Sequence, residues 1–220
     1  MYASDLISYA VPPLKGADTG LMANQWMNDF HVRHLPVVDN GTFLGLVSED
    51  HILNMPPDGA IHSHYEYGLI NVFVQPHQHL YEIMKCVVDS GLSVVPVANK
   101  DRQCMGLITL DNLIKQLVES GSITHPGGVI VIEMTPRDYS LAEIARIIES
   151  EKVLILSSFI TSNIDQSLIE LTIKLNKEDL KHVVATLERF DYNVRDSFYE
   201  SDYLDSLNDR YDSLIRYLNI

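Results

Sequence analysis

Apolar and polar positions follow the same pattern twice in the first half of the chain. The first copy runs from Arg33 to Leu53 and the second from Leu92 to Ile114, with Pro36 and Pro96 at equivalent points. In each copy a helix precedes a short apolar strand, a polar turn, a second strand, and a Ser or Thr suited to cap another helix. The helix before the second copy has its apolar residues at helical spacing, at Leu80, Ile83, Met84, Val87 and Val88. The repeat predicts two equivalent α/β units.

Two strands are predicted in each copy. They are expected at Leu35–Val38 and Phe43–Val47 in the first copy, and at Val94–Ala98 and Met105–Ile108 in the second. Between the strands of the first copy, Asp39-Asn40-Gly41 is typical of a tight hairpin, because Asn and Gly tolerate positive φ. Each copy should therefore fold as a β-hairpin flanked by helices.

The pattern changes after residues 121–128, whose composition is that of a linker. Strands are then predicted at Val129–Met134, Val153–Ile160, Ile169–Leu175 and Val194–Tyr199, with helices around Leu141–Ile148 and Leu180–Leu187. The strict alternation over Ile169–Leu175 indicates a strand with one buried face. The order βαββαβ predicts a ferredoxin-like unit.

The last segment forms a third type of element. Its apolar residues alternate at spacings of three and four, at Leu204, Leu207, Tyr211, Leu214 and Leu218, which predicts a short amphipathic helix. The chain is thus expected to have a mixed α/β (α+β) fold in four parts. These are a first repeat at 1–60, a second at 61–124, the βαββαβ unit at 128–199 and the helix at 200–220.

Charge and composition narrow the functional classes. With 16 Lys and Arg against 30 Asp and Glu, the net charge of −14 disfavours nucleic acid and anionic membranes as partners. No apolar run approaches the ~18 residues of a membrane span, and the first residues lack the features of a signal peptide. Two cysteines, Cys86 and Cys104, form no disulfide framework, and we expect both to be buried thiols of a cytoplasmic protein.

The two copies carry a recognisable motif. The segments PVVDNGTFLGLVSEDHIL and PVANKDRQCMGLITLDNLI resemble a tandem pair of CBS domains, also called a Bateman module. The βαββαβ region resembles an ACT domain, and the combination is similar to bacterial regulatory proteins of the acetoin-utilisation type. The resemblance implies a regulatory homodimer without catalytic activity. It also implies clefts between the repeats that sense a small adenosyl molecule such as AMP, ATP or S-adenosylmethionine.

The same resemblance identifies candidate ligand-binding residues. In the family pattern a hydroxyl residue at the end of the second strand meets phosphates, and an Asp three positions later binds ribose hydroxyls. This chain has the hydroxyls at Ser48 and Thr109, but His51 and Asn112 occupy the Asp positions. Both replacements can still accept a hydrogen bond. Arg33 is the basic residue best placed near the motif, so these five residues form the predicted site.

The neighbouring acids Asp50 and Asp111 stand one position before the expected Asp. One residue turns a helix by about 100°, so we do not expect them to replace it. With only six basic residues over residues 1–125, phosphate-rich ligands are disfavoured. An adenosine nucleotide or S-adenosylmethionine remains the candidate ligand, and no cofactor is obligatory. The alternative is a ligand-free scaffold that serves dimerisation and contact with a protein partner.

Other chemistry is less well supported by the sequence. The first loop of the ACT-like region, Thr135–Ser140, has no glycine to let backbone approach a ligand, which favours dimerisation over amino-acid binding. A metal site would require the histidine pairs to meet, at His62, His64, His77 and His79. We expect these to be ordinary loop residues. No nucleophile elbow, phosphate loop or metalloprotease motif occurs, so we expect no enzyme.

Overall fold

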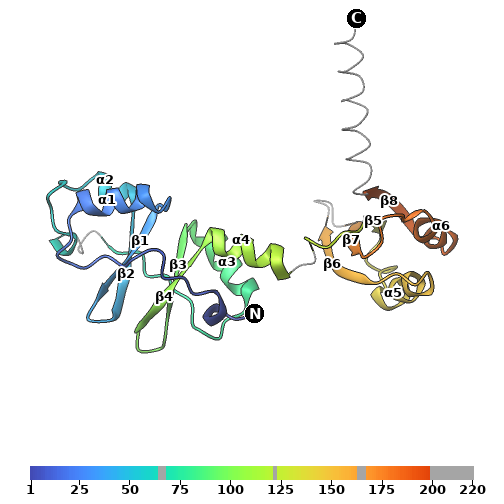
Figure 1. Cartoon of the computed structure of the whole chain (residues 1–220), viewed down its shortest axis with the longest axis horizontal. Helices are drawn as coiled ribbons and strands as arrows, with labels where there is room; N and C mark the ends of the chain where they lie inside the picture. Colours follow the sequence, from blue (N-terminus) through green and yellow to red (C-terminus); the bar gives the residue numbers. More distant parts are fainter. Residues whose placement is uncertain (64–67, 121–122, 163–166, 199–220) are drawn as a thin grey trace, which may run out of the picture. The chain divides into compact units, whose positions relative to one another are not determined.

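The structure of the protein, a computed structural model, describes residues 1–63, 68–120, 123–162 and 167–198. The chain separates into two compact units, Met1–Leu117 and Val118–Ile220 (Figure 1). The amphipathic helix predicted at 200–220 lies outside the described residues. Within the described residues, no helix is long and apolar enough to cross a membrane.

The first unit confirms the predicted repeat. Its elements are η1 (Ala3–Leu6), α1 (Gly20–Asp29), β1 (His34–Asp39), β2 (Thr42–Ser48), α2 (Glu49–Leu53), α3 (Leu80–Ser90), β3 (Val94–Ala98), β4 (Cys104–Thr109) and α4 (Leu110–Ser120). The strand pairs β1–β2 and β3–β4 are antiparallel hairpins, and all four strands lie within two residues of their predicted limits. The first hairpin turns through Asn40 and Gly41, both at positive φ, as the sequence indicated.

The two hairpins have the same register. In β1 the register shifts between Val37 and Val38, and Val38 then faces Phe43. In β3 the shift falls between Val97 and Ala98, and Ala98 then faces Cys104. Phe43 and Cys104 therefore occupy equivalent positions in the two repeats.

The chain that enters each repeat pairs with the other repeat. Ser8 N–H donates to the carbonyl of Leu107 in β4 at 2.7 Å, and Ile70 exchanges two hydrogen bonds with Leu46 in β2. Gly106 permits the first approach, because a Cβ there would lie 2.4 Å from Cγ2 of Ile7. Each hairpin thus receives an additional strand-like segment from the opposite repeat.

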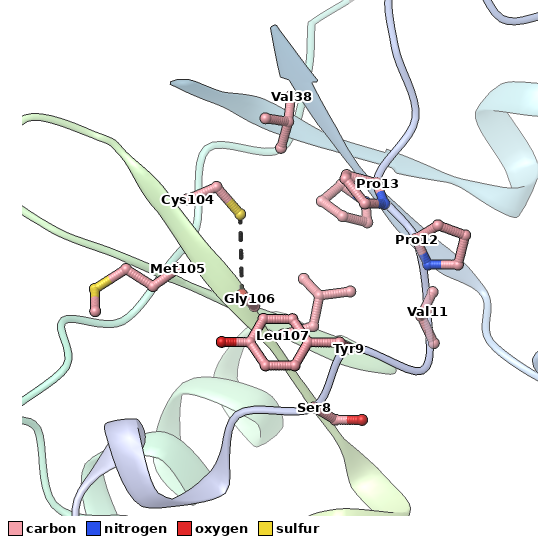
Figure 2. A pocket seen from close by; sticks show the side chains of 11 residues that line it. Ser8, Tyr9, Val11, Pro12, Pro13, Val38, Cys104, Met105, Gly106 and Leu107 are labelled. Carbon is pink, nitrogen blue, oxygen red and sulfur yellow. Dashed lines mark hydrogen bonds between the residues drawn. The ribbon is translucent and has the colours of Figure 1, made fainter. Parts of the chain in front are cut away.

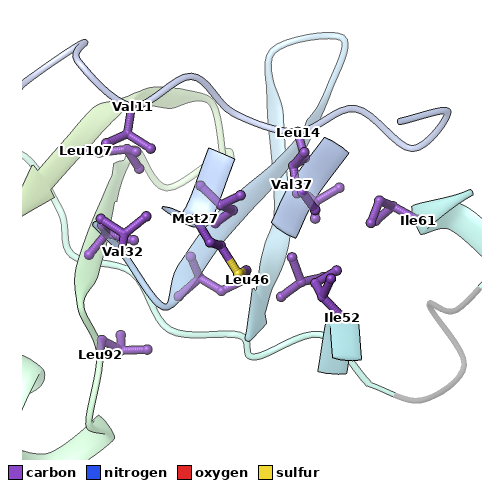
Figure 3. Packing of buried hydrophobic residues seen from close by; sticks show 14 of the residues in the cluster. Val11, Leu14, Met27, Val32, Val37, Leu46, Ile52, Ile61, Leu92 and Leu107 are labelled. Carbon is purple, nitrogen blue, oxygen red and sulfur yellow. The ribbon is translucent and has the colours of Figure 1, made fainter. Parts of the chain in front are cut away.

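Two clusters of buried residues hold this unit together. The larger combines residues of the first repeat with Leu92, Val94 and Leu107 of the second, and Figure 3 shows Leu107 next to Val11. The smaller cluster belongs to the second repeat but includes Ala3 and Leu6 from the start of the chain. Cores shared in this way make one unit of the two repeats.

The second unit has the predicted order βαββαβ. It consists of β5 (Val129–Met134), α5 (Leu141–Ser150), β6 (Ile155–Ser162), β7 (Ile169–Leu175), α6 (Lys181–Arg189) and β8 (Asn193–Phe198). The sheet order is β6-β7-β5-β8 and every neighbouring pair is antiparallel, which is the ferredoxin-like arrangement. Strand β6 starts two residues later than predicted. Alternate residues of β5 and β7 form one core with both helices, so α5 and α6 cover the same face.

Candidate functional site

The two hydroxyls predicted to meet a ligand cap helices. Ser48 Oγ accepts a hydrogen bond from the backbone N–H of His51 at 3.2 Å, at the start of α2. Thr109 Oγ1 accepts one from Asn112 N–H at 3.2 Å, at the start of α4. Each hydroxyl thus satisfies a helix N–H that has no partner within its own helix. A ligand would have to use the remaining hydrogen-bonding capacity of these groups.

One polar cavity of about 250 Å³ lies at the Ser48 cap. It is formed where β1 begins and β2 ends, and its lining residues are Arg33, His34, Ser48, Glu49, Asp50 and Gly91. Gly91 belongs to the second repeat, where it ends α3 in a left-handed conformation with φ of 62°. The cavity therefore has walls from both repeats; we call it the Arg33 cavity.

Ser93 of the second repeat fixes one wall of the Arg33 cavity. The backbone N–H of Arg33 donates to Ser93 Oγ at 2.9 Å, and Ser93 N–H donates to His34 Nδ1 at 3.2 Å. Burial, followed by the nearby charge of Arg33, lowers the pKa of His34 below its usual value. His34 is therefore neutral at pH 7, with Nδ1 as the acceptor that holds the two repeats together at this point.

The charges of the Arg33 cavity limit what can bind there. Its lining has one guanidinium, on Arg33, and two carboxylates, on Glu49 and Asp50. The carboxylates can accept hydrogen bonds from sugar hydroxyls or amines, and the guanidinium can donate to a single anionic or carbonyl group. Because the acids outnumber the base, the cavity favours neutral or cationic molecules over those with several phosphates.

The structure brings only part of the predicted site together. Arg33 and Ser48 line one cavity, whereas Thr109 and Asn112 lie outside it. His51 contributes its backbone to the Ser48 cap but is not a lining residue. Asp50, which we did not expect to replace the family's Asp, does line the cavity. In the first turn of a helix the Cα–Cβ bonds tilt toward the N-terminus, which brings Asp50 back toward Ser48.

Comparison with known proteins identifies the first unit. Residues 22–58 and 70–119 match the model of the CBS domain family. The first unit contains a CBS domain pair. Solved structures similar to this chain include a CBS domain pair/ACT domain protein from Thermotoga maritima, at 18% identity and a TM-score of 0.48, over 54% of this chain and 98% of that one.

Two further solved structures are similar to the CBS pair at low identity. One is a CBS domain pair in complex with 5′-methylthioadenosine and S-adenosyl-L-methionine, at 19% identity and a TM-score of 0.43, over 54% of this chain and 97% of that one. The other, from Vibrio cholerae, has been assigned to acetoin utilization, with 23% identity and a TM-score of 0.47, over 57% of this chain and 98% of that one. All three matches cover little more than half of this chain.

A second cavity of the CBS pair was not predicted. It has a volume of about 330 Å³ and is mainly apolar, with a lining of Ser8, Tyr9, Val11, Pro12, Pro13, Pro36, Val38 and residues 104–107. Figure 2 shows Val38, Pro13 and Cys104 around it, with Tyr9 and Leu107 on the opposite side. We call it the Cys104 cavity.

The cysteines of the CBS pair are free thiols that are only half-buried, not fully buried as the sequence predicted. Burial raises the pKa of both Cys86 and Cys104 above the usual value. Because the thiolate is the reactive form, neither thiol is activated as a nucleophile.

The ferredoxin-like unit has a third cavity, of about 620 Å³. Several residues of the loop Thr135–Ser140 line it, together with Glu133, Glu143, Tyr192 and their neighbours. Tyr192 lies with its hydroxyl 3.4 Å from a carboxylate oxygen of Glu143. Burial and this carboxylate raise the pKa of Tyr192. A loop without glycine thus still borders a cavity.

Two of the four histidines considered for metal binding have other contacts. His62 Nδ1 lies 2.7 Å from the carbonyl of Gly16, and His79 Nδ1 accepts from Tyr81 N–H to cap α3. Within the part of the chain that the structure describes, no three metal-ligating side chains come together. His64 lies outside that part.

Proposed function

We propose that this chain is a regulatory protein whose CBS pair binds a small adenosyl-type molecule in the Arg33 cavity. The observation that carries the proposal is the position of that cavity, which has the predicted residues Arg33 and Ser48 on one wall and Gly91 of the second repeat on the other. A polar cavity at the contact of two repeats suits a sensor, because its ligand touches both parts whose arrangement can change. The role is regulatory rather than catalytic.

The cavity chemistry favours some adenosyl compounds over others. Ribose hydroxyls would donate to Glu49 or Asp50, and Arg33 would meet one carbonyl or anionic group of the ligand. A triphosphate would bring several negative charges close to two carboxylates. S-adenosylmethionine, 5′-methylthioadenosine and AMP therefore fit better than ATP.

Ligand binding would act on a homodimer in the cytoplasm. A ligand shifts a conformational equilibrium only by its difference in affinity between the two states. The contacts of Ser93 with Arg33 and His34 join the repeats next to the cavity, so a ligand there can favour one arrangement of the repeats. The ferredoxin-like unit would serve as an ACT-like dimerisation domain, and a protein partner would detect the altered dimer.

A thermal-shift comparison tests this function. S-adenosylmethionine, 5′-methylthioadenosine, AMP and ATP would each be added to the full chain at millimolar concentration. A ligand at ~100 times its Kd stabilises the folded state by ~2.7 kcal/mol. In a chain of this length that raises the melting temperature by roughly 5–10 °C. We expect a shift with at least one of the first three compounds and a smaller one with ATP.

In the variant Asp50→Asn the melting temperature should rise less at the same ligand concentration. The apparent affinity calculated from the shift should be at least tenfold weaker. Asp111→Asn is the matched control, because Asp111 occupies the equivalent position in the second repeat and does not line the Arg33 cavity. An equal loss of apparent affinity in Asp50→Asn and Asp111→Asn would reject the adenosyl proposal. The absence of any thermal shift in the unmodified chain would also reject it. The absence of any shift would favour the second candidate, a ligand-free scaffold, which is suggested by the use of both Ser48 and Thr109 as caps.

A further inference from the structure

The four-stranded sheet of the ferredoxin-like unit has two unlike faces. Helices α5 and α6 cover one face, where alternate residues of β5 and β7 are buried in a common core. The residues between these point to the opposite face, which we call the open face. Val129 and Val131 of β5 lie there and are only half-buried. Their neighbours Ile130 and Ile132, on the helix side, are completely buried.

The register of the strands shows which other side chains share the open face, because directly paired residues have their side chains on the same face. Val131 pairs with Thr172 of β7, and Thr172 pairs with Phe159 of β6. Val129 pairs with Phe198 of β8. The rings of Phe159 and Phe198 are 58% and 57% exposed. These two rings and the two valines form a diagonal that we call the apolar stripe.

The charged groups beside the apolar stripe have partners within the unit. Lys174 Nζ donates to the carbonyl of Gly127 at 2.6 Å, and Arg195 forms an ion pair with Glu170. The exposed apolar side chains are therefore what the open face offers to an occupant. Apolar patches of this kind mark interaction surfaces. An occupant needs apolar side chains in a row rather than charges.

A segment of the chain itself has such a row. Residues 200–220 lie outside the described residues and follow β8 almost directly. Their apolar residues form the seam of the predicted amphipathic helix, at Leu204, Leu207, Tyr211, Leu214 and Leu218. Three acids have helical spacing on the other side of such a helix, at Asp205, Asp209 and Asp212. The seam itself contains no charged residue, which matches the apolar stripe.

The connection is long enough for the segment to fold back onto the sheet. Strand β8 ends at Phe198, which is part of the apolar stripe. Residues 199–203 separate it from Leu204, and connections of this length are common between packed elements. A helix from Leu204 to Leu218 is ~21 Å long. Strands of the length of β5 are ~20 Å long, so the seam can follow the whole face.

We propose that residues 200–220 pack as a helix over the open face of their own chain, with the seam on the apolar stripe and the three acids toward water. A single short helix is marginal in water, so its stability has to come from such packing. The helix lies across the face and leaves the outer edges of β6 and β8 uncovered. The inference is therefore compatible with the proposed dimer and independent of ligand binding.

The fluorescence of one tryptophan tests whether the apolar stripe is covered. Phe159→Trp places an indole in the stripe of the full chain. Trp26→Phe removes the only natural tryptophan, which packs in the CBS pair and not against this sheet. Acrylamide should quench the introduced indole at least threefold less efficiently than it quenches free N-acetyltryptophanamide. Equal quenching would overturn the proposal.

Variants of the segment show whether the seam provides the cover. Leu207→Asp together with Leu214→Asp should raise the quenching constant at least twofold, because two charges would then face the apolar stripe. Ser206→Asp together with Ser213→Asp is the matched control. It adds the same charge at neighbouring positions outside the seam and should leave the constant nearly unchanged. Equal constants in the two double variants would contradict the packing of the seam.

A crosslink distinguishes the segment of the same chain from that of a second copy. Phe159→Cys and Tyr211→Cys would be combined in a chain carrying Cys86→Ala and Cys104→Ala, and treated with a short bifunctional maleimide. We expect a product with the mass of one chain plus one linker. Ser213→Cys in place of Tyr211→Cys should give at least threefold less of it. A covalent dimer as the main product, or equal yields at the two positions, would overturn the proposal.

Discussion

Replacing Arg102 tests whether the two repeats are joined as the structure shows. Its Nε donates to the carbonyl of Phe43 at 3.0 Å, and its Nη2 donates to the carbonyl of Leu44 at 3.2 Å. Nη2 also donates to Oδ1 of Asn71 at 2.8 Å. One side chain from the β3–β4 turn thus connects strand β2 of the first repeat with the chain that enters the second. We predict that Arg102→Met destabilises the CBS pair.

The expected loss follows from these contacts. Two of the three hydrogen bonds are partly buried, and bonds from a charged donor contribute ~1.5–3 kcal/mol each. The exposed bond to Asn71 and the contacts of the guanidinium with the rings of Phe43 and Phe73 add about 1–2 kcal/mol. Ordering a long side chain costs about 2 kcal/mol. The net effect should be a decrease of about 2–6 kcal/mol in the free energy of unfolding.

Urea unfolding followed by circular dichroism provides the measurement. Arg102→Lys keeps the charge but has no forked group to reach three oxygens. Its free energy of unfolding should therefore decrease by more than half of the decrease found for Arg102→Met. Lys100→Met changes the charge of an exposed residue in the same turn and should stay within about 0.5 kcal/mol of the unmodified protein. If Arg102→Met were as stable as Lys100→Met, the contacts of Arg102 with β2 and with Asn71 would not join the repeats as described.

Three further predictions concern other parts of the chain. Ser48→Ala and Thr109→Ala each remove a helix cap and should each lower the free energy of unfolding in urea by about 1 kcal/mol. Because the pKa of His34 is lowered in the folded state, the unfolded chain takes up its proton first, so stability should fall as the pH drops below about 6.5. His34→Asn keeps an acceptor and should lessen that fall in melting temperatures measured between pH 7 and pH 5. In the ferredoxin-like unit, Gly127→Ala should lower the free energy of unfolding, measured with urea, by at least about 2 kcal/mol. The reason is that φ of Gly127 is +147° and the new Cβ would overlap the carbonyl of Leu175.

The sequence predicted the elements well because their signals are local. The limits of β7 follow directly from the alternation of apolar and polar residues over Ile169–Leu175, and the first hairpin follows from the turn at Asn40 and Gly41. The exchange of entering segments between repeats has no such signal. Only Gly45 and Gly106 mark it, because both lie where another segment approaches too closely for a side chain.

The predicted site stays a prediction, but two of its residues line one cavity. Arg33 and Ser48 could be placed near each other because the motif fixes one just before the first strand and the other at the end of the second. Asp50 lines the Arg33 cavity because it is the second residue of α2 and the Cα–Cβ bonds of a helix tilt toward its N-terminus. His34 was missed because its role depends on Ser93, which is distant in sequence and has no motif of its own.

The Cys104 cavity could have been found in the sequence by asking where the two repeats differ. Aligning their second strands puts Cys104 opposite Phe43, and a large buried ring opposite a small thiol implies either a cavity or a compensating side chain. Among the described residues, the counterpart of Phe73 is the smaller Pro13, which does not fill the space of the missing ring.

Differences between the repeats also distinguish the Arg33 cavity from its counterpart. The second repeat has Ser93 where the first has Arg33, and Val94 where the first has His34. Leu110 likewise replaces Glu49. Arg33 and Glu49 thus have no charged counterpart in the second repeat, although Asp50 has one in Asp111. The mainly apolar cavity lies along β4. Repetition explains why the CBS pair folds as it does, because equivalent residues form equivalent hairpins. The repeats differ in chemistry where equivalence has been lost: the Arg33 cavity is polar and charged, whereas the Cys104 cavity is mainly apolar.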